Sequence, residues 1–283
     1  MLKAFELIRP GDLAEAVAAV ADGAIPLAGG TDLLVRMKKG IIAPKKIVDL
    51  SGLKELREIK EDEENIILGS LVTHGDVVNS ELTNKYLSLL VQGCRTVGSP
   101  QIRNTGTLGG NIINASPAAD SVPPLVALGA KVVLSSVNGE REMKIEEFLV
   151  GPGKTLKRPD ELLTGIVVKK MKPEERCLYR KLGQRKALAI SIASVAVKFG
   201  FDPVTKRCTN PAIAFGAVGP VVKRAVELER LLEQRILDQQ TIKEISLKAR
   251  EFCDPISDIR ASAEYRREMC CSLLYEALYE LTC

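Results

Sequence analysis

The sequence predicts an α+β protein with two small α/β subdomains, followed by a domain with a small antiparallel sheet and helices. Three observations carry this prediction. In the first half of the chain, short apolar strand candidates alternate with helical segments. In the last third, strand candidates come first and helical spacing follows. Between these parts, the charged stretch 170–176 contains a proline and marks a domain boundary.

The first subdomain is expected to cover residues 1–52. Asp12 and Glu15 form a capping-box pattern before an Ala- and Val-rich helix that ends before Gly23. A glycine turn then joins a buried strand to a short helix, a layout that brings helix N-terminal amide groups to an anion. The strands are expected at residues 25–28 and 46–50, and the short helix at residues 33–39.

The second subdomain is expected to cover residues 53–172. Asn138-Gly139 stands between two strand candidates and is a strong hairpin signal. The acidic turn Glu61–Glu64 gives a hairpin-like arrangement nearer the start of the subdomain. Strands are expected at residues 56–60, 65–69, 131–137, 140–144 and 161–169, and helices at residues 73–79, 83–97 and 122–130.

The C-terminal domain is expected to cover residues 173–283. Asp202-Pro203 turns the chain between two strand candidates. From Lys223 onward the apolar spacing is helical, so the sheet should be backed by helices. Strands are expected at residues 178–182, 191–199 and 212–217, and helices at residues 225–237, 241–252 and 261–281.

The composition narrows the class of function. Of the 283 residues, 46% are hydrophobic and 27% are charged, which is ordinary for a globular protein. The net charge of +4 is small, and no basic run with interleaved aromatic residues points to nucleic acid. No apolar stretch reaches the roughly 18 residues of a membrane span, and Lys3, Glu6 and Arg9 interrupt any secretory apolar core. We therefore expect a cytoplasmic protein without nucleic-acid or membrane partners.

The cysteines and the single histidine disfavour a metal site in this chain. The seven cysteines are irregularly spaced and form no C-x-x-C pattern, so we expect free thiols in a reducing compartment. A Ser-His-Asp or Cys-His mechanism could use only His74. His74 follows Thr73, a candidate helix N-cap, and we therefore expect it to have a structural or supporting role.

Two glycine-rich segments, about eighty residues apart, carry the main functional signal. Residues 27–34 read LAGGTDLL and residues 104–112 read NTGTLGGNI, and each has a Gly-Gly pair beside Thr and Asp or Asn. Residues without a Cβ allow a backbone to approach a phosphate, whose charge then meets N–H groups. The pattern indicates two walls of one diphosphate site, and a purely structural turn is the alternative for each segment.

Neither segment fits the common nucleotide motifs. Gly-x-Gly-x-x-Gly with an acidic residue about twenty positions later is missing, and so is a Gly-Lys-Ser/Thr ending, so the common dinucleotide fold is disfavoured and a P-loop is excluded. Asp120 follows the second segment at the expected start of a helix. Its carboxylate would accept a hydrogen bond from a ribose hydroxyl. A helix N-cap is the alternative, and the two roles can coexist.

These motifs resemble the FAD-binding (medium) subunit of the molybdenum hydroxylases, the family of xanthine dehydrogenase and carbon monoxide dehydrogenase. The resemblance rests on residues 27–34, 101–104, 105–121 and 151–154, and it runs the length of the chain. Within this family, the chain resembles the bacterial xanthine dehydrogenase FAD-binding subunits in particular. The resemblance implies a PCMH-type, vanillyl-alcohol oxidase-like FAD-binding domain of two α/β subdomains, followed by a flavoprotein C-terminal domain.

The resemblance also implies a set of FAD-binding residues. The first segment would hold the pyrophosphate, the second would line the opposite wall, and Asp120 would bind a hydroxyl of the ribose or ribityl region. Leu162 and Leu163 match apolar positions near the flavin and adenine, with plain strand core as the alternative. Lys181 matches a basic residue by the isoalloxazine ring. The set is Leu27, Ala28, Gly29, Gly30, Thr31, Asp32, Leu33, Thr107, Gly109, Gly110, Asn111, Asp120, Leu162, Leu163 and Lys181.

The function that the resemblance implies is electron transfer in an oxidoreductase complex. Electrons from [2Fe-2S] clusters on a small partner subunit would pass through FAD to NAD+ or another acceptor. The substrate, with purines such as xanthine favoured, would be oxidised at a molybdopterin cofactor on a large subunit. A heterotrimer or a dimer of heterotrimers is expected.

Two departures from wider flavoprotein patterns refine this expectation. No group of cysteines for an extra iron–sulfur cluster is visible, and His74 lies outside both glycine segments, so FAD should be bound non-covalently. This chain would supply no catalytic acid–base residue and no metal ligand. The alternatives are a non-redox enzyme or binding protein for a sugar nucleotide or other diphosphate, and a non-catalytic assembly subunit of the same fold.

Overall fold

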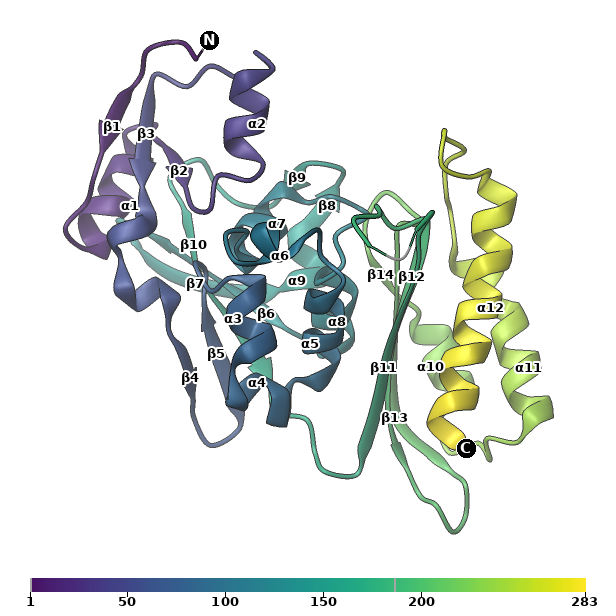
Figure 1. The fold of residues 1–283 in the computed structure, drawn as a ribbon. Helices are drawn as coiled ribbons and strands as arrows, with labels where there is room; N and C mark the ends of the chain where they lie inside the picture. The colour runs from purple at the N-terminus through teal and green to yellow at the C-terminus, as the bar shows by residue number, and fades with distance from the viewer. Residues whose placement is uncertain (1, 186) are drawn as a thin grey trace.

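Three sheets of three or more strands follow one another along the chain in the computed structural model, which describes residues 2–185 and 187–283 (Figure 1). A three-stranded sheet lies at the N-terminal end, a five-stranded sheet lies in the centre, and a four-stranded sheet carries the C-terminal helices. This arrangement confirms the predicted α+β class.

The N-terminal unit is a small parallel α/β unit. Its strands pair in the order β1-β3-β2, with Ile25 opposite Ile47 and Leu27 opposite Asp49. Asp12 caps the first helix by accepting from the Glu15 amide, as predicted. The elements are β1 (Glu6–Ile8), α1 (Leu13–Ala21), β2 (Ile25–Leu27), α2 (Leu33–Lys38) and β3 (Lys46–Asp49). The first glycine segment therefore forms the connection from β2 to α2.

The central unit is an antiparallel sheet in the order β4-β5-β10-β6-β7, with a small separate hairpin of β8 and β9. Helices pack on the face that is turned toward the C-terminal domain (Figure 1). The strands are β4 (Ile59–Glu61), β5 (Asn65–Gly69), β6 (Lys131–Ser136), β7 (Gly139–Lys144), β8 (Leu149–Gly151), β9 (Lys154–Thr155) and β10 (Leu162–Lys169). The helices are α3 (His74–Asn79), α4 (Glu81–Tyr86), α5 (Ser88–Arg95), α6 (Pro100–Arg103), α7 (Leu108–Asn114), α8 (Val122–Ala127) and α9 (Ile145–Phe148).

The C-terminal sheet is buried on both faces. Along its second strand, Val195 and Val197 pack into the core with the C-terminal helices, whereas Ala196 between them packs into the core of the central unit. The strands are β11 (Glu175–Leu182), β12 (Ala193–Phe201), β13 (Cys208–Gly216) and β14 (Lys223–Arg224), and the helices are α10 (Val226–Leu232), α11 (Gln239–Leu247) and α12 (Ala263–Thr282). This alternation joins the two domains through a continuous apolar interface.

Some predicted elements were wrong in extent. The helix expected over residues 83–97 is two helices that part at the fully buried Leu87. The helix expected over residues 225–237 ends at Leu232, because the chain turns through Gln234, whose φ is 60°. The strand expected over residues 56–60 begins only at Ile59, and β1 was missed.

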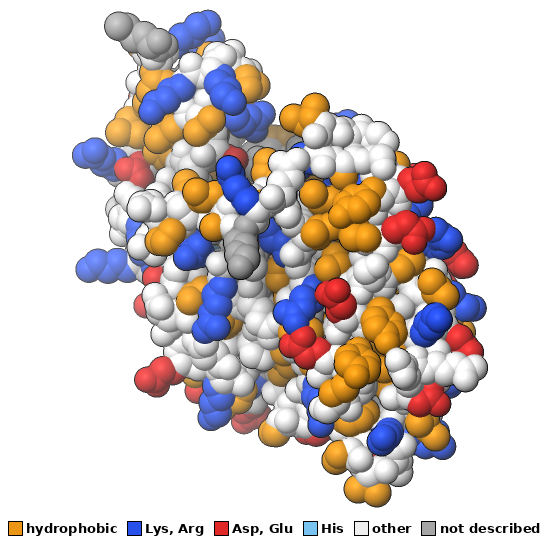
Figure 2. All heavy atoms as spheres, turned by 45° about the vertical axis from the view of Figure 1, so that its right-hand side comes forward, with side chains coloured by type: hydrophobic (Ala, Val, Ile, Leu, Met, Phe, Trp, Pro, Cys, Tyr) orange, Lys and Arg blue, Asp and Glu red, His pale blue; other side chains and the backbone are white. Residues whose placement is uncertain are grey.

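The surface mixes charged and apolar side chains. Figure 2 shows Lys, Arg, Asp and Glu interspersed with hydrophobic groups on the face that carries the C-terminal domain. No helix in the described part of the chain combines the length and the apolar character that crossing a bilayer would need.

Candidate functional site

A cavity of about 450 Å³ is lined by both glycine segments. It lies between the N-terminal unit and the central unit, and its volume is typical of small-molecule sites. The start of β10 contributes Leu162 and Leu163 to the same lining. Most of the predicted site residues are brought together here, namely Ala28, Gly29, Gly30, Thr31, Asp32, Leu33, Thr107, Gly109, Gly110, Asn111, Leu162 and Leu163.

The first glycine of each pair is required by close backbone packing. A Cβ on Gly29 would lie 1.8 Å from the Thr105 carbonyl oxygen, and a Cβ on Gly109 would lie 2.6 Å from the Ser70 carbonyl oxygen. No side chain fits at either position, since real Cβ contacts do not fall below 3.0 Å. These two glycines therefore bring the chain segments of the cavity wall together.

The second glycine of each pair has a different task. Gly30 has a φ of 71°, in the left-handed region that favours glycine, and this turn directs the chain from β2 into α2. Gly110 is exposed in the cavity, and a Cβ there would closely approach only Thr107 Oγ1, at 2.9 Å. Gly110 thus keeps the cavity open.

The second glycine segment begins a helix, where the sequence indicated a glycine loop. Thr107 is the N-cap of α7, and its hydroxyl accepts from the Gly110 amide at 3.0 Å. The amides of Leu108 and Gly109 donate to the carbonyl oxygens of Val72 and Ser70. The amide groups of Leu108, Gly109 and Gly110 are therefore already hydrogen-bonded within the protein.

The first glycine segment leaves its amides open. Within the described part of the chain, the backbone N–H groups of residues 29–33 have no hydrogen-bond partner. Asp32, at the N-cap of α2, makes no side-chain cap bond either. These residues line the cavity, so the N–H groups are available to an anionic ligand.

The sequence did not point to five further polar residues of the cavity. They are Arg36, Ser70, His74, Asn114 and Lys157. The Lys157 ammonium donates to the carbonyl oxygens of Arg158 and Glu161, and burial lowers its pKa. Arg36 lies on the exposed side of α2. Two cationic side chains therefore border the cavity, and no glycine pattern signalled either of them.

His74 is buried in the cavity wall, with 2% of its surface exposed. Burial and the nearby Arg103 charge lower its pKa to about 4, so the ring is neutral at neutral pH. Its Nδ1 atom has no hydrogen-bond partner within the described residues. The sequence placed Thr73 correctly as the cap of α3 but missed that the next side chain faces this cavity.

Asp120 and Lys181 lie together, outside the lining of the cavity. Asp120 is buried and accepts from Tyr179 Oη at 3.1 Å, Ser191 Oγ at 2.6 Å and Lys181 Nζ at 2.5 Å. Burial, followed by the Asp120 charge, raises the pKa of Tyr179 well above its usual value. The cluster links the start of α8 to β11. Its hydrogen bonds therefore cross between the two domains and hold them together.

The capping role considered for Asp120 was wrong. Ser121 holds the N-cap position of α8 and makes no side-chain cap bond. The Ser121 hydroxyl instead donates to Asn111 Oδ1 at 2.8 Å. Since Asn111 lines the cavity, the Asp120 cluster lies directly behind this part of its wall. Leu27, at the end of β2, also lies outside the lining and packs beside Gly30.

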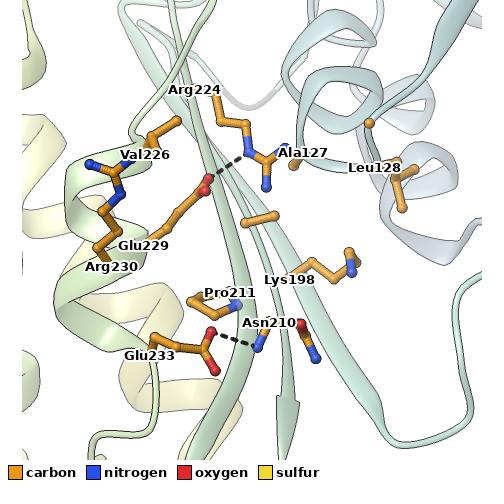
Figure 3. A pocket seen from close by; sticks show the side chains of 12 residues that line it. Ala127, Leu128, Lys198, Asn210, Pro211, Arg224, Val226, Glu229, Arg230 and Glu233 are labelled. Carbon is orange, nitrogen blue, oxygen red and sulfur yellow. Dashed lines mark hydrogen bonds and ion pairs between the residues drawn. The ribbon is translucent and has the colours of Figure 1, made fainter.

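A second cavity, of about 390 Å³, lies against the C-terminal domain (Figure 3). Its acidic groups are occupied, because Glu229 accepts from Arg224 Nε at 2.8 Å and Glu233 accepts from the Asn210 amide at 3.0 Å. None of the sequence-predicted site residues lines it. Its paired charges distinguish it from the glycine-lined cavity.

No metal site accompanies either cavity. Across residues 2–185 and 187–283, no three or more His, Cys, Asp or Glu side chains group so that they could hold a metal ion. The seven cysteines are free; five are buried, Cys177 is half-buried and Cys283 is exposed.

The donor set of the glycine-lined cavity fits a diphosphate. The open amides of residues 29–33 and the cationic Arg36 and Lys157 suit its negative charge. The Nδ1 atom of His74, buried and without a partner among the described residues, is a further hydrogen-bonding position in the wall. The apolar Leu162 and Leu163 supply the flat, dry surface that a ring system requires.

Two family models match the chain. The FAD binding domain in molybdopterin dehydrogenase matches residues 3–169, and the CO dehydrogenase flavoprotein C-terminal domain matches residues 178–281. Together they account for both domains of the fold.

Individual relatives agree with these matches. The chain is 31% identical over 280 residues to the glyceraldehyde dehydrogenase medium chain of Sulfolobus acidocaldarius, with 98% of each chain covered. It is 32% identical over 263 residues to a putative xanthine dehydrogenase FAD-binding subunit of Escherichia coli K12, covering 91% of this chain and 89% of the relative.

A solved structure extends the agreement to the fold. A reconstituted CO dehydrogenase from Oligotropha carboxidovorans contains a chain that superposes with a TM-score of 0.95 at 28% identity, covering 100% of this chain and 99% of that one. Both relatives are named as subunits of dehydrogenases, and the second is named as an FAD-binding subunit. The cavity, the two domains and the relatives together place this chain among the FAD-binding medium subunits of the molybdenum hydroxylase family.

Proposed function

We propose that this chain is the electron-transfer subunit of a molybdenum hydroxylase and that it holds FAD non-covalently in the glycine-lined cavity. The observation that carries the proposal is the row of open amides at residues 29–33, which faces a cavity that Gly110 keeps open. Bound FAD supplies the redox chemistry that links one-electron and two-electron carriers. The protein supplies position, charge and shielding from water.

Each part of the wall has a proposed task. The backbone of residues 28–33 holds the pyrophosphate, with Arg36 and Lys157 adding positive charge. Thr107 and Asn111 form the opposite wall, in which Thr107 also fixes the start of α7. Leu162 and Leu163 pack against the ring systems of FAD. Leu27 supports Gly30 from behind.

The Asp120–Lys181 pair belongs to the proposal in a modified form. We propose that Asp120 binds a hydroxyl of the ribose or ribityl region and that Lys181 lies by the isoalloxazine ring. Lys181 Nζ donates to an Asp120 carboxylate oxygen at 2.5 Å, and the neighbouring Ser121 donates to Asn111, which lines the cavity. Contact with FAD therefore requires the cofactor to extend past the cavity toward the domain interface. We place the domain boundary between residues 172 and 173, in the segment that leads to this interface.

The proposed complex contains two further subunits. A small subunit with [2Fe-2S] clusters delivers electrons, and a large subunit with molybdopterin oxidises the substrate, in a heterotrimer or a dimer of heterotrimers in the cytoplasm. NAD+ is the proposed acceptor. Relatives are named for glyceraldehyde, xanthine and carbon monoxide. We favour a purine such as xanthine, and propose that the large subunit makes this choice.

The absorbance of the purified chain tests the central part of this proposal. A flavin spectrum with FAD released by mild denaturation is expected, whereas a colourless chain that cannot be reconstituted with FAD contradicts it. Gly110→Leu should weaken FAD binding roughly tenfold or more, or about 1.4 kcal/mol, because the new side chain enters the cavity. Gly52→Leu is the matched control, since a Cβ there meets nothing within 4 Å.

Co-purification of the partner subunits tests the proposed complex, its substrate and its electron acceptor. Purification from the native host should bring down a protein with iron–sulfur absorbance and a large molybdenum-containing protein. Reduction of NAD+ by this complex in the presence of xanthine would support both finer proposals. Turnover with a different substrate or acceptor would replace them without affecting the FAD site.

A further inference from the structure

Two buried polar atoms without hydrogen-bond partners among the described residues belong to the wall of the same cavity. Within the described residues, four buried side-chain nitrogen or oxygen atoms lack a hydrogen-bond partner, and two of them, Ser70 Oγ and His74 Nδ1, belong to residues that line the glycine-lined cavity. Buried polar groups are nearly always hydrogen-bonded, because an unmade bond costs the full desolvation of the group. Two such atoms on one short connection therefore point to a ligand.

The ring of His74 is held in a fixed place. Its residue opens α3, where Thr73 and Asp76 form a complete capping box. The His74 amide donates to the Gly106 carbonyl oxygen at 3.1 Å. A Cβ on Gly106 would lie 3.6 Å from His74 Cδ2 and 3.5 Å from Thr31 Oγ1. The imidazole thus stands where the two glycine segments meet.

Ser70 is fixed just as firmly at the other end of the connection. Its amide donates to the Thr164 carbonyl oxygen, and its carbonyl oxygen accepts from the Gly109 amide, both at 3.0 Å. Both backbone groups are therefore used, and 4% of the residue is exposed. The hydroxyl is the one polar group of Ser70 that remains free to bind a ligand.

The chemistry of the two groups suits a ligand with many oxygen atoms. A neutral imidazole offers one N–H donor and one acceptor nitrogen, and a serine hydroxyl both donates and accepts. Such neutral donors can hydrogen-bond to phosphate oxygens and to hydroxyls. In FAD, both kinds of oxygen lie next to each other, along the diphosphate and the ribityl chain.

We propose that Ser70 and His74, on the connection from β5 to α3, form a third wall of the FAD site and hydrogen-bond the diphosphate–ribityl stretch of the cofactor. This inference rests on the proposed function. The two glycine segments supply backbone contacts and space, whereas this third segment, residues 70–74, supplies side-chain contacts. It carries no glycine pair, and for that reason the sequence did not reveal it.

The single histidine makes a direct test possible. In protein labelled with ¹⁵N-histidine, every imidazole signal belongs to His74. Addition of FAD to the apoprotein should shift at least one ring nitrogen by several parts per million, because a hydrogen bond forms. FAD binding with unchanged ring signals overturns this inference alone. Failure of FAD to bind at all overturns the proposed function and this inference with it.

Matched serine variants test the other half. Ser70→Ala should raise the Kd of FAD roughly three- to tenfold, the usual effect of one neutral hydrogen bond. Ser246→Ala is the control, since Ser246 Oγ is also buried without a partner but lies on α11, in the C-terminal domain. Both variants should keep or raise the melting temperature of the apoprotein. An FAD affinity of Ser70→Ala equal to that of the control overturns the inference.

The conservative variant separates contact from packing. His74→Asn retains a donor and an acceptor and should bind FAD more tightly than His74→Leu, which retains neither. Equal affinities for these two variants, each shown to be folded by its melting temperature, would mean that His74 only fills space and would overturn its proposed role.

Discussion

The two glycine segments look alike in the sequence and do different work in the structure. In the first, the N–H groups of residues 29–33, which line the cavity, have no hydrogen-bond partner among residues 2–185 and 187–283. In the second, the N–H groups of Leu108, Gly109, Gly110 and Asn111 are all hydrogen-bonded to Val72, Ser70 or Thr107. The first segment has the free N–H groups that our proposal assigns to an anion, whereas the second uses its N–H groups to hold a wall together. A glycine pair therefore has to be read together with its hydrogen bonds.

The difference arises at the N-cap of the helix that each segment begins. Thr107 caps α7 and takes up the Gly110 amide, while the antiparallel bridge from Thr73 to Thr107 brings the β5–α3 connection alongside. Asp32, at the matching position before α2, makes no cap bond. The capping hydroxyl of Thr107 and the carbonyl oxygens of Val72 and Ser70 thus separate a closed helix start from an open one.

The largest expected effect is a loss of stability when the contact between the two glycine segments is disrupted. Gly29→Ala should destabilise the protein by about 3 kcal/mol or more, because its Cβ would overlap the Thr105 carbonyl oxygen and backbone must move. Urea unfolding measures the loss. Gly52→Ala, with free space around its Cβ, should stay within about 0.5 kcal/mol of the wild type. An equally small effect of Gly29→Ala would show that the two segments do not touch in solution.

The next effect lies behind the second segment. Asp120→Ala should cost about 3 kcal/mol of stability, since it leaves the partly buried Lys181 without its charged partner and also orphans Ser191. FAD affinity should fall as well, by about 1–3 kcal/mol, if the proposed hydroxyl contact exists. Titration of FAD into the folded variant separates the two effects. An unchanged affinity for FAD would show that Asp120 only stabilises the contact between the two domains.

An effect of similar size depends on pH. The pKa of His74 is lowered to about 4 in the folded protein, so between pH 6.5 and 4 the unfolded chain binds more protons. Stability should be constant above about pH 6.5 and fall by roughly 3 kcal/mol as the pH decreases to 4. The same decline in His74→Leu, measured by urea unfolding at each pH, would assign it to other groups.

The smallest effect opens the closed segment. Thr107→Ala removes the cap of α7 and should cost about 1 kcal/mol. The variant frees the Gly110 amide, so the second segment becomes more like the first. Hydrogen exchange at Gly110 should accelerate in the apoprotein, and Thr105→Ala, whose hydroxyl donates only to the exposed Gln101 carbonyl, is the control. Unchanged exchange at Gly110 would contradict the capping explanation.

Local chemistry made part of the fold predictable. Asn138-Gly139 predicted the hairpin of β6 and β7, where Ser136 pairs with Gly139. Thr73 and Asp12 were correct caps, because capping depends on neighbours within four residues. The glycine segments predicted residues of the cavity wall because the pattern that signals them lies within a few neighbouring residues.

The rest depends on contacts between distant parts of the chain. His74 reaches the cavity only because Thr73 bridges to Thr107. The partners of Asp120 come from β11 and from Ser191, more than fifty residues further on, and no local pattern distinguishes them from a helix cap. β1 has three residues and is stabilised by parallel pairing with β3, which leaves no turn signal between them.

Hydrogen–deuterium exchange tests the central claim most directly. In the apoprotein, amides of residues 29–33 should exchange fast and those of residues 108–111 slowly, because only the latter are hydrogen-bonded. Saturation with FAD should strongly protect the first segment and change the second little. Strong protection of residues 108–111 by FAD, with residues 29–33 unaffected, would contradict the account.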